Sequence, residues 1–247
     1  MSTDLDIASI CAEIAQSYSP CDVSDALLKL HVPYAGYLRD ISPIPTRNGS
    51  TTRLVAPIST VLFVDTAHAP ETQYDGLIVP PAPNIPSDKH FTDMAPTGTV
   101  VVMQQPAHQV ASLLGDIVAT RYKVRGVKGC VIDGRSRDIV GCGELCKDGS
   151  FQCWSKALTS PGTSLQARPW AVDVPLKIGD VVVQPDDVLV ADEAERVCCV
   201  IPRKKLSEVM RLLPVHKEAD DGLLDDVRRG LGFKDAIQRW PKHYSNH

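Results

Sequence analysis

The chain has 247 residues, of which 43% are hydrophobic and 23% charged, with a formal net charge of -4 and a pI near 6.0. This is ordinary globular composition, and its weakly acidic balance argues against a nucleic-acid or anionic-membrane partner. No apolar run approaches the roughly 18 residues of a membrane span. The N-terminal segment MSTDLDIASI carries early acids and no basic residue, so we expect no secretory signal and a cytoplasmic location.

The N-terminal region is predicted to be helical. Residues 5–18 place apolar side chains at helical spacing, which favours a first helix. A second helix is expected from about Pro20 onward, because proline is tolerated in a first turn and either Ser19 or Asp22 can cap it.

The central region is predicted to combine strands with one helix. Segments 53–66 and 98–106 are rich in β-branched residues and are expected to form strands. The proline-rich segment 69–96 between them is predicted to be a long loop or insertion and is a candidate lid. A helix over 116–125 and a strand over 129–133 are expected to follow.

The C-terminal part is predicted to be β-rich and then helical. Segment 141–163 is expected to be irregular with short strand pieces, whereas 171–202 is dense in valine and predicts a β-meander. Turns are expected within it at 179–180 and 185–187. An amphipathic helix is expected over 204–216, with a polar helical tail beyond it.

These elements predict an α/β or α+β fold with a central β-rich layer, and no internal repeat divides the chain. We therefore expect a single domain over 1–247, with a core of about 20–203 and a C-terminal helical arm of about 204–247. Acidic and basic residues are interspersed except in this arm, where 218–226 is locally acidic.

The eight cysteines predict neither a disulfide framework nor a zinc site. Five lie in apolar surroundings and are expected to be buried: Cys11, Cys21, Cys130, Cys198 and Cys199. Cys142, Cys146 and Cys153 lie closer together, but no CxxC pair or nearby histidine completes a zinc set. A structural disulfide is not expected in a cytoplasmic chain.

The stretch from Gly115 to Asp138 is the strongest functional signal. Its helix would rise about 15 Å and its strand would return about 16 Å, so Arg137 and Asp138 should come back to the level of Asp116. Amides at a helix start attract anions, and a guanidinium offers two parallel donors to a carboxylate. Asp138 is a hard oxygen ligand suited to Mg²⁺ or Mn²⁺. Together these groups indicate a site where a metal and Arg137 stabilise the enolate of a 2-oxo acid.

Each of these residues also has a purely structural explanation. Asp116 taken alone is equally well explained as a helix cap. Arg137 taken alone is better explained by an ion pair with Asp138 or Asp133. Asp133-Gly134 is a turn signal, so Asp133 is expected to hydrogen-bond backbone rather than take part in chemistry.

The remaining ionisable residues are weaker candidates for a functional site. Three histidines have no recognisable partner and are expected at the surface or as caps: His68, His90 and His108. Three cations are expected on a solvated helix face: Lys123, Arg125 and Lys128. Motifs for a phosphate-binding loop, a serine nucleophile or a dinucleotide are absent from the sequence.

The 115–138 stretch is similar to the GxxxA…GxxGxVxDGxxRD signature of the RraA-like proteins. That family includes the class II 4-hydroxy-4-methyl-2-oxoglutarate/4-carboxy-4-hydroxy-2-oxoadipate aldolases. Supporting pieces occur in the family's order from about 20 to 235: CDVSDAL, RLVAPISTV, APTGTVVVM, SPGT, VDVPLKIGDVVVQPDDVLVAD and VIP. The DGxxRD motif with its upstream GDxxA is fairly specific, whereas the valine-rich pieces are weak alone.

The resemblance implies an α/β/β sandwich with N-terminal helices and a C-terminal helical arm, assembled as trimers or hexamers with active sites between subunits. It implies that Asp138 binds the divalent metal directly and that Arg137 holds the pyruvate portion of the substrate. Asp116 matches the acid that contacts the metal through water. The helix start matches the contacts to the substrate carboxylate: Gly115, Ile117 and Val118.

A further carboxylate is implied from the C-terminal helix of a neighbouring subunit, and three residues of this chain can supply it: Glu218, Asp220 or Asp221. The chain also departs from the family pattern. Ser155-Lys156-Ala157 stands where members commonly have Ala-Arg-Gly, and Pro185-Asp186-Asp187 stands in place of PGD. Segment 69–96 is divergent as well, so the distal part of the substrate stays open.

The leading hypothesis is therefore a metal-dependent lyase that cleaves a C–C bond next to a pyruvyl unit, because retro-aldol cleavage and oxaloacetate decarboxylation share one pyruvate enolate. One alternative is another metal-enolate reaction in specialised metabolism, which the divergent segments permit. A second is a non-catalytic binding protein of the type that inhibits RNase E. Such regulators are expected to lack a complete set of metal-binding acids, whereas Asp116 and Asp138 are both present.

Overall fold

The computed structural model describes residues 6–44, 52–69 and 72–241. The helices are α1 (Ile7–Ser17), α2 (Pro20–Lys29), α3 (Asp116–Val124), α4 (Ile139–Cys146), α5 (Leu206–Arg228) and α6 (Phe233–Arg239). The strands are β1 (Ser42–Pro43), β2 (Arg53–Asp65), β3 (Val100–Gln104), β4 (Gly129–Ser136), β5 (Gln152–Leu158), β6 (Ala167–Val172), β7 (Leu176–Ile178), β8 (Val181–Val183), β9 (Val188–Asp192) and β10 (Val197–Ile201).

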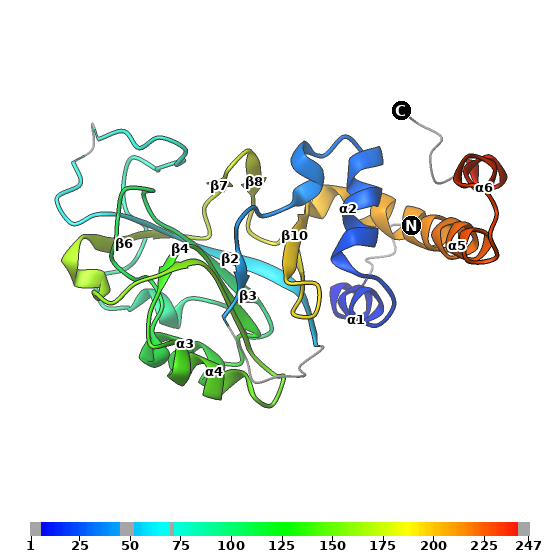
Figure 1. Ribbon diagram of the computed structural model, residues 1–247. Coiled ribbons are helices and arrows are strands. Elements are labelled where there is room, and N and C mark those ends of the chain that lie inside the picture. The colour runs from blue at the N-terminus through cyan, green and yellow to red at the C-terminus, as the bar shows by residue number, and fades with distance from the viewer. Residues whose placement is uncertain (1–5, 45–51, 70–71, 242–247) are drawn as a thin grey trace.

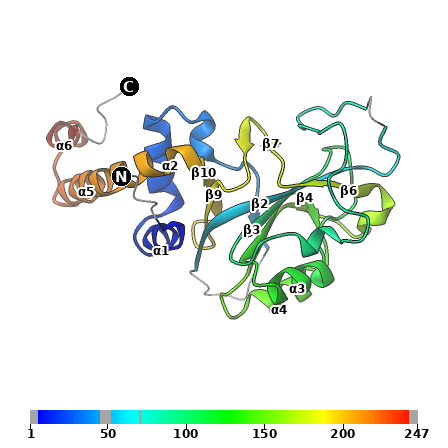
Figure 2. The ribbon, with the colours of Figure 1, turned by 180° about the vertical axis from the view of Figure 1, so that it is seen from behind.

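One sheet organises these elements, with strand order β1-β5-β4-β3-β2-β9-β10 and β6 paired to β2. Apolar side chains on one face of the sheet pack against α3 and α4, and those on the other face pack against the β7–β8 hairpin. Helices α1, α2 and α5 pack with β9 and β10 in a third apolar cluster. Helices α5 and α6 lie at the opposite end of the molecule from α3 and α4 (Figures 1 and 2). The predicted α/β/β layering is confirmed.

Strand β2 is the hub of the sheet. Its residues 53–57 pair antiparallel with β9, and residues 58–62 pair parallel with β3. Residues 61–65 pair antiparallel with β6, across a register shift. Parallel pairing continues from β3 to β4 and from β4 to β5, so these three strands end at the same edge of the sheet.

The helices follow local signals in the sequence. Ser19 and Asp22 cap α2 together, because Ser19 Oγ accepts the Asp22 amide at 3.1 Å while Asp22 Oδ2 accepts the Ser19 amide at 2.7 Å. Helix α5 contains residues 206–216 of the predicted 204–216 segment but continues to Arg228, and Pro214 lies inside it. Packing of its apolar face against α2 holds the helix together at the proline. No described helix is both long enough and apolar enough to cross a membrane.

Three expectations of regular structure were wrong. Segment 141–163 is not irregular, because it contains the end of α4 and all of β5. Strand β4 continues to Ser136, so Asp133-Gly134 lies in a strand, at a register shift, rather than in a turn. Segment 171–202 is not one meander, because β7 and β8 form a separate hairpin while β9 and β10 join the main sheet.

Long-range pairing explains the differences in the C-terminal part. Strand β6 pairs with β2 more than 100 residues earlier, as in the Val61–Val172 register, and no local pattern encodes such a partner. The turns predicted at 179–180 and 185–187 do separate β7 from β8 and β8 from β9. Within segment 69–96, the described residues contain only one short 3-10 turn, Phe91–Asp93, which agrees with the predicted loop.

The cysteines are mostly buried, and burial is confirmed for four of the five for which it was expected: Cys11, Cys130, Cys198 and Cys199. All of them except Cys21 lie in the interior, and all eight are free thiols. The expectation for Cys21 was wrong, because it occupies an exposed position in the first turn of α2. Loss of solvation raises the pKa of the interior Cys130 and Cys198 thiols, which disfavours reactive thiolates there.

Candidate functional site

The candidate site begins at the N-terminus of α3. Gly115 is the N-cap, with an extended backbone, and its carbonyl accepts the Ala119 amide at 3.0 Å. The amides of Asp116, Ile117 and Val118 therefore fall in the first turn, where a helix offers no acceptor. Among the described residues no side chain caps the helix, so the explanation of Asp116 as a cap is wrong.

The chain returns to this helix start through β4. Leu114 forms a parallel bridge with Ser136, and its carbonyl accepts the Arg137 amide at 2.9 Å. This pairing places Arg137 and Asp138 beside Gly115. A Cβ atom at Gly115 would lie 2.8 Å from Asp138 Oδ2, so glycine is needed for the carboxylate to approach the helix start.

Asp138 has an unusual conformation. It is the N-cap residue of α4 with φ 53° and ψ 39°, in the left-handed region, yet its side chain makes no capping hydrogen bond. Asp138 Oδ2 lies 3.2 Å from Arg137 Nε, and the two side chains are 44% and 39% exposed. Such an exposed pair is worth at most about 1 kcal/mol, so both groups remain available to a ligand.

Two glycines give the other charged groups their positions. A Cβ atom at Gly162, in the loop after β5, would lie 3.0 Å from Arg137 Nη1, so the guanidinium lies against that backbone. A Cβ atom at Gly141, in α4, would lie 2.8 Å from the Cβ of Asp116. Close approach of α3 and α4 at Gly141 therefore brings Asp116 and Asp138 to the same side of the helix start.

Replacing Gly141 with alanine should separate α3 from α4 and destabilise the protein. The new methyl group would meet the Cβ and carboxylate of Asp116 within 3 Å, and such overpacking costs about 1–3 kcal/mol. Urea unfolding would measure the loss of unfolding free energy. Val124→Ala, at the far end of α3 where the side chain is 74% exposed, is the control and should change little. Equal stability of the two variants would contradict the close packing.

The expectation for Asp133 was wrong. Its side chain bonds two side chains rather than the backbone, with Gln104 Nε2 at 2.9 Å and Lys156 Nζ at 3.1 Å. Arg137 consequently pairs with Asp138 and not with Asp133. Lys156, from the segment that departs from the family pattern, is thus the ion-pair partner of a carboxylate that is only 9% exposed.

The histidines contribute to structure outside the site. His90 caps the Phe91–Asp93 turn, as the sequence allowed. His68 Nδ1 lies 3.1 Å from the Tyr74 hydroxyl. His108 Nε2 lies 3.0 Å from Asp65 Oδ1, so these two histidines have partners that the sequence did not reveal.

The expectation of a solvated face was correct for Lys128, which is exposed, but wrong for Lys123. Lys123 Nζ donates to the Leu145 carbonyl at 2.6 Å and to Asp148 at 2.8 Å, which ties α3 to the end of α4. The Lys123 ammonium, together with Ser150, holds the pKa of the Asp148 carboxyl well below its usual value. The side chain of Arg125 is partly buried.

The C-terminal carboxylates do not join the site within one chain. Glu218, Asp220 and Asp221 lie on α5, at the opposite end of the molecule from α3 (Figures 1 and 2). Among the described residues, no group of three or more histidine, cysteine or acidic side chains is arranged to hold a metal ion. The site formed by one chain is therefore Asp116, Arg137, Asp138 and the first turn of α3.

Comparisons with known proteins agree with the fold. An uncharacterized protein from Pseudomonas syringae pv. tomato str. DC3000 superposes with a TM-score of 0.71 at 23% identity, over 93% of this chain and 96% of that one. Streptomyces coelicolor RraAS2, described as an unusual member of the RNase ES inhibitor RraA protein family, gives a TM-score of 0.67 at 22% identity, over 89% and 98% of the two chains. At these identities the likeness concerns the fold alone.

Sequence comparison gives the family. The chain is 31% identical over 135 residues to a Halalkalibacterium halodurans protein that is named "Putative 4-hydroxy-4-methyl-2-oxoglutarate aldolase". That match covers 51% of this chain and 57% of the relative, so the chain spans little more than half of the relative's length. The family model RraA-like, Aldolase/RraA, matches residues 20–195, well over half of the chain. The chain belongs to the RraA-like (Aldolase/RraA) family.

Proposed function

We propose that the protein is a divalent-metal-dependent carbon–carbon lyase that acts next to a pyruvyl unit. Its reactions would be retro-aldol cleavage of 4-hydroxy-2-oxo diacids, decarboxylation of oxaloacetate, or both. The observation that carries the proposal is the gathering of Asp116, Arg137 and Asp138 around the uncapped first turn of α3. The family and the aldolase name of the H. halodurans relative support the reaction class.

The donor set fits a hard divalent cation. Asp116 and Asp138 offer carboxylate oxygens, and Asp138 does not use its side chain to cap α4. Mg²⁺ and Mn²⁺ favour one or two protein carboxylates with several retained waters. Asp138 would hold the ion directly and Asp116 through water. When bound, the ion supplies Lewis-acid stabilisation of negative charge on the substrate oxygen.

The chain's own groups bind and orient the substrate. Arg137 presents parallel donors to the carboxylate of the pyruvyl unit, and contact with the Gly162 backbone limits the orientations of its guanidinium. The Ile117 and Val118 amides at the positive end of α3 donate to the same carboxylate. Asp116 accepts, through water, the proton released from the C4 hydroxyl in the aldol cleavage.

Self-association completes the proposal. Ile117 is 80% exposed and Val140 is 78% exposed. They are neighbours in sequence of Asp116 and Gly141, which pack against each other. We propose that a neighbouring subunit covers these two side chains. We include in the proposal a trimer or hexamer in which Glu218 or Asp220 of a neighbouring subunit completes the metal site.

The direct test is release of pyruvate from a panel of 2-oxo diacids, with and without Mg²⁺ or Mn²⁺. Activity should disappear in EDTA and return when the metal is added back. The reason is that Asp116 and Asp138 are themselves anionic, so the metal ion is needed to stabilise the negative charge of the enolate. Release unaffected by EDTA would contradict the metal-dependent mechanism. A protein inactive on every diacid with either metal would instead favour the non-catalytic members of the family.

A further inference from the structure

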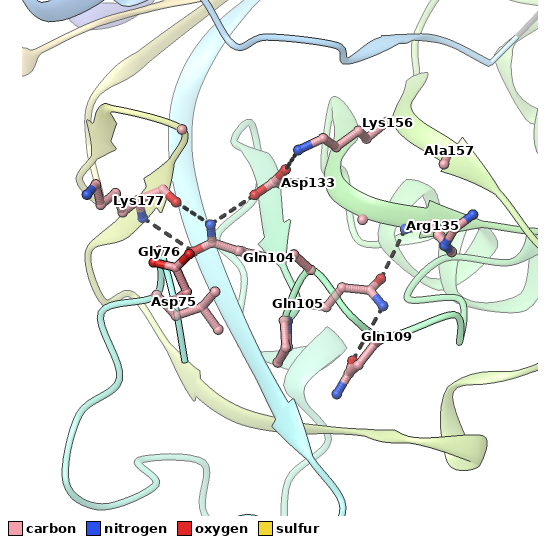
Figure 3. Close-up of a pocket in the computed structure, with 15 residues that line it drawn as sticks. Asp75, Gly76, Gln104, Gln105, Gln109, Asp133, Arg135, Lys156, Ala157 and Lys177 are labelled. Atoms are coloured by element: carbon pink, nitrogen blue, oxygen red, sulfur yellow. Dashed lines mark hydrogen bonds and ion pairs between the residues drawn. The ribbon is translucent and has the colours of Figure 1, made fainter. Parts of the chain in front are cut away.

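A second pocket, of about 300 Å³, lies where β3, β4 and β5 end, and none of its residues belongs to the Asp116, Arg137 and Asp138 site. Its floor is the face of the sheet toward the β7–β8 hairpin, and residues 75–77 of the 69–96 segment line its edge (Figure 3). This volume is at the lower end of the range for small-molecule sites.

The side-chain amides of Gln104 and Gln105, which line this pocket, already form hydrogen bonds with neighbouring groups. Gln104 Nε2 donates to Asp133 Oδ2 at 2.9 Å and to the Lys177 carbonyl, and Gln104 Oε1 accepts the Lys177 amide at 3.3 Å. Gln105 Oε1 accepts the Arg135 amide at 3.0 Å, and its nitrogen donates to a backbone carbonyl. Because these buried amides are satisfied by their neighbours, the pocket is preformed and rigid.

Unused hydrogen-bonding capacity is concentrated in one ion pair. Lys156 Nζ donates to Asp133 Oδ1 at 3.1 Å (Figure 3). An ammonium has three donors and a carboxylate about four acceptor positions. Within the described part of the chain, each group therefore keeps capacity to spare. Asp133 is 9% exposed whereas the Lys156 side chain is 43% exposed, so the carboxylate is at the floor and the ammonium is nearer the opening.

The geometry points to this pocket as a binding site for a small hydroxycarboxylate anion. The ligand's carboxylate pairs with Lys156, and its hydroxyl donates to Asp133. Arg135, whose guanidinium donates to the Leu158 carbonyl at 3.1 Å, adds a second positive charge to the lining. A carboxylate without a hydroxyl has nothing to donate to Asp133, and a neutral alcohol has no charge to pair with Lys156. The inference does not depend on the proposed function.

Calorimetric titration in EDTA with L-malate, and with succinate as the acid that lacks the hydroxyl, tests this site. Malate should bind wild-type protein more tightly than succinate does. The double variant Asp133→Asn/Lys156→Gln removes both charges and so leaves no lone buried charge. It should weaken malate binding by about tenfold or more. Lys156→Arg should retain binding, and thermal melting checks that each variant is folded.

Two further variants locate the binding. Asp93→Asn/Arg121→Gln neutralises a more exposed ion pair outside the pocket and should bind malate as wild type does. Arg137→Gln, in the first site, should also leave malate binding unchanged. The inference is overturned if the wild-type protein does not bind malate, or if the Asp133→Asn/Lys156→Gln variant binds it normally. Binding lost in Arg137→Gln, or succinate as tight as malate, overturns it as well.

Discussion

Replacing Asp138 with asparagine is expected to abolish metal-dependent pyruvate release, with a fall in kcat/KM of at least about 100-fold. The reason is the loss of an anionic oxygen beside the start of α3, where Oδ2 is 2.8 Å from the Cβ position of Gly115. Asparagine tolerates the left-handed backbone that residue 138 adopts at φ 53°. The fold should therefore be preserved, and circular dichroism with thermal melting would check it.

A metal-binding measurement separates this effect from an indirect one. Isothermal titration with Mn²⁺ should show weaker binding to Asp138→Asn than to wild-type protein. Asp40→Asn, at an exposed aspartate that also has a left-handed backbone, with φ 66°, and pairs with the preceding arginine, is the matched control and should change neither activity nor metal affinity. Full activity in a folded Asp138→Asn protein would remove this residue from the metal site.

Replacing Arg137 with lysine should lower kcat/KM by roughly 100-fold although the charge is kept. A guanidinium donates two parallel hydrogen bonds to a carboxylate, whereas an ammonium acts as a point charge. Loss of one well-placed donor to a developing anion typically costs about 100-fold or more. Gly162 lies against the Arg137 guanidinium, so lysine would also leave a gap there. Steady-state kinetics with oxaloacetate would measure the change.

The pattern of the loss identifies the role of Arg137. Failure to clamp the substrate carboxylate should raise KM as well as lower kcat, while affinity for Mn²⁺ stays near the wild-type value. Arg121→Lys, on the same helix as Asp116 but paired with Asp93, is the control and should be active. An Arg137→Lys variant with wild-type kinetics would show that the arginine only holds Asp138 in place.

The proximity of Asp116, Arg137 and Asp138 could be predicted because it depends on local geometry. The helix and the strand after it return the chain to the level of the helix start. Helix α3 has nearly the predicted bounds, whereas β4 continues beyond the predicted 129–133 to Ser136. Family resemblance then added roles for the side chains. The contacts that hold these groups in place could not be predicted. They depend on close packing of α4 at Gly141 and of the loop after β5 at Gly162.

Two parts could not be predicted because long-range contacts decide them. Helix α4 contains Gly141 and Gly143, and glycine lowers helix propensity. Its formation rests on packing against α3 and the sheet. Asp133-Gly134 matches a common turn signal, but pairing with β3 and β5 keeps it in a strand. Its side-chain partners Gln104 and Lys156 lie more than 20 residues away in either direction.

The position of β2 couples the stability of the two ends of the molecule. One continuous strand pairs with β9 at its start, and with β3 and β6 further along. Removal or fraying of β2 would break its hydrogen bonds to β9, which the N-terminal helices cover, and its hydrogen bonds to β3 and β6 at the same time. Unfolding is therefore expected to be cooperative across the sheet, and a substitution near α1 or α2 can reduce the amount of folded site without touching it.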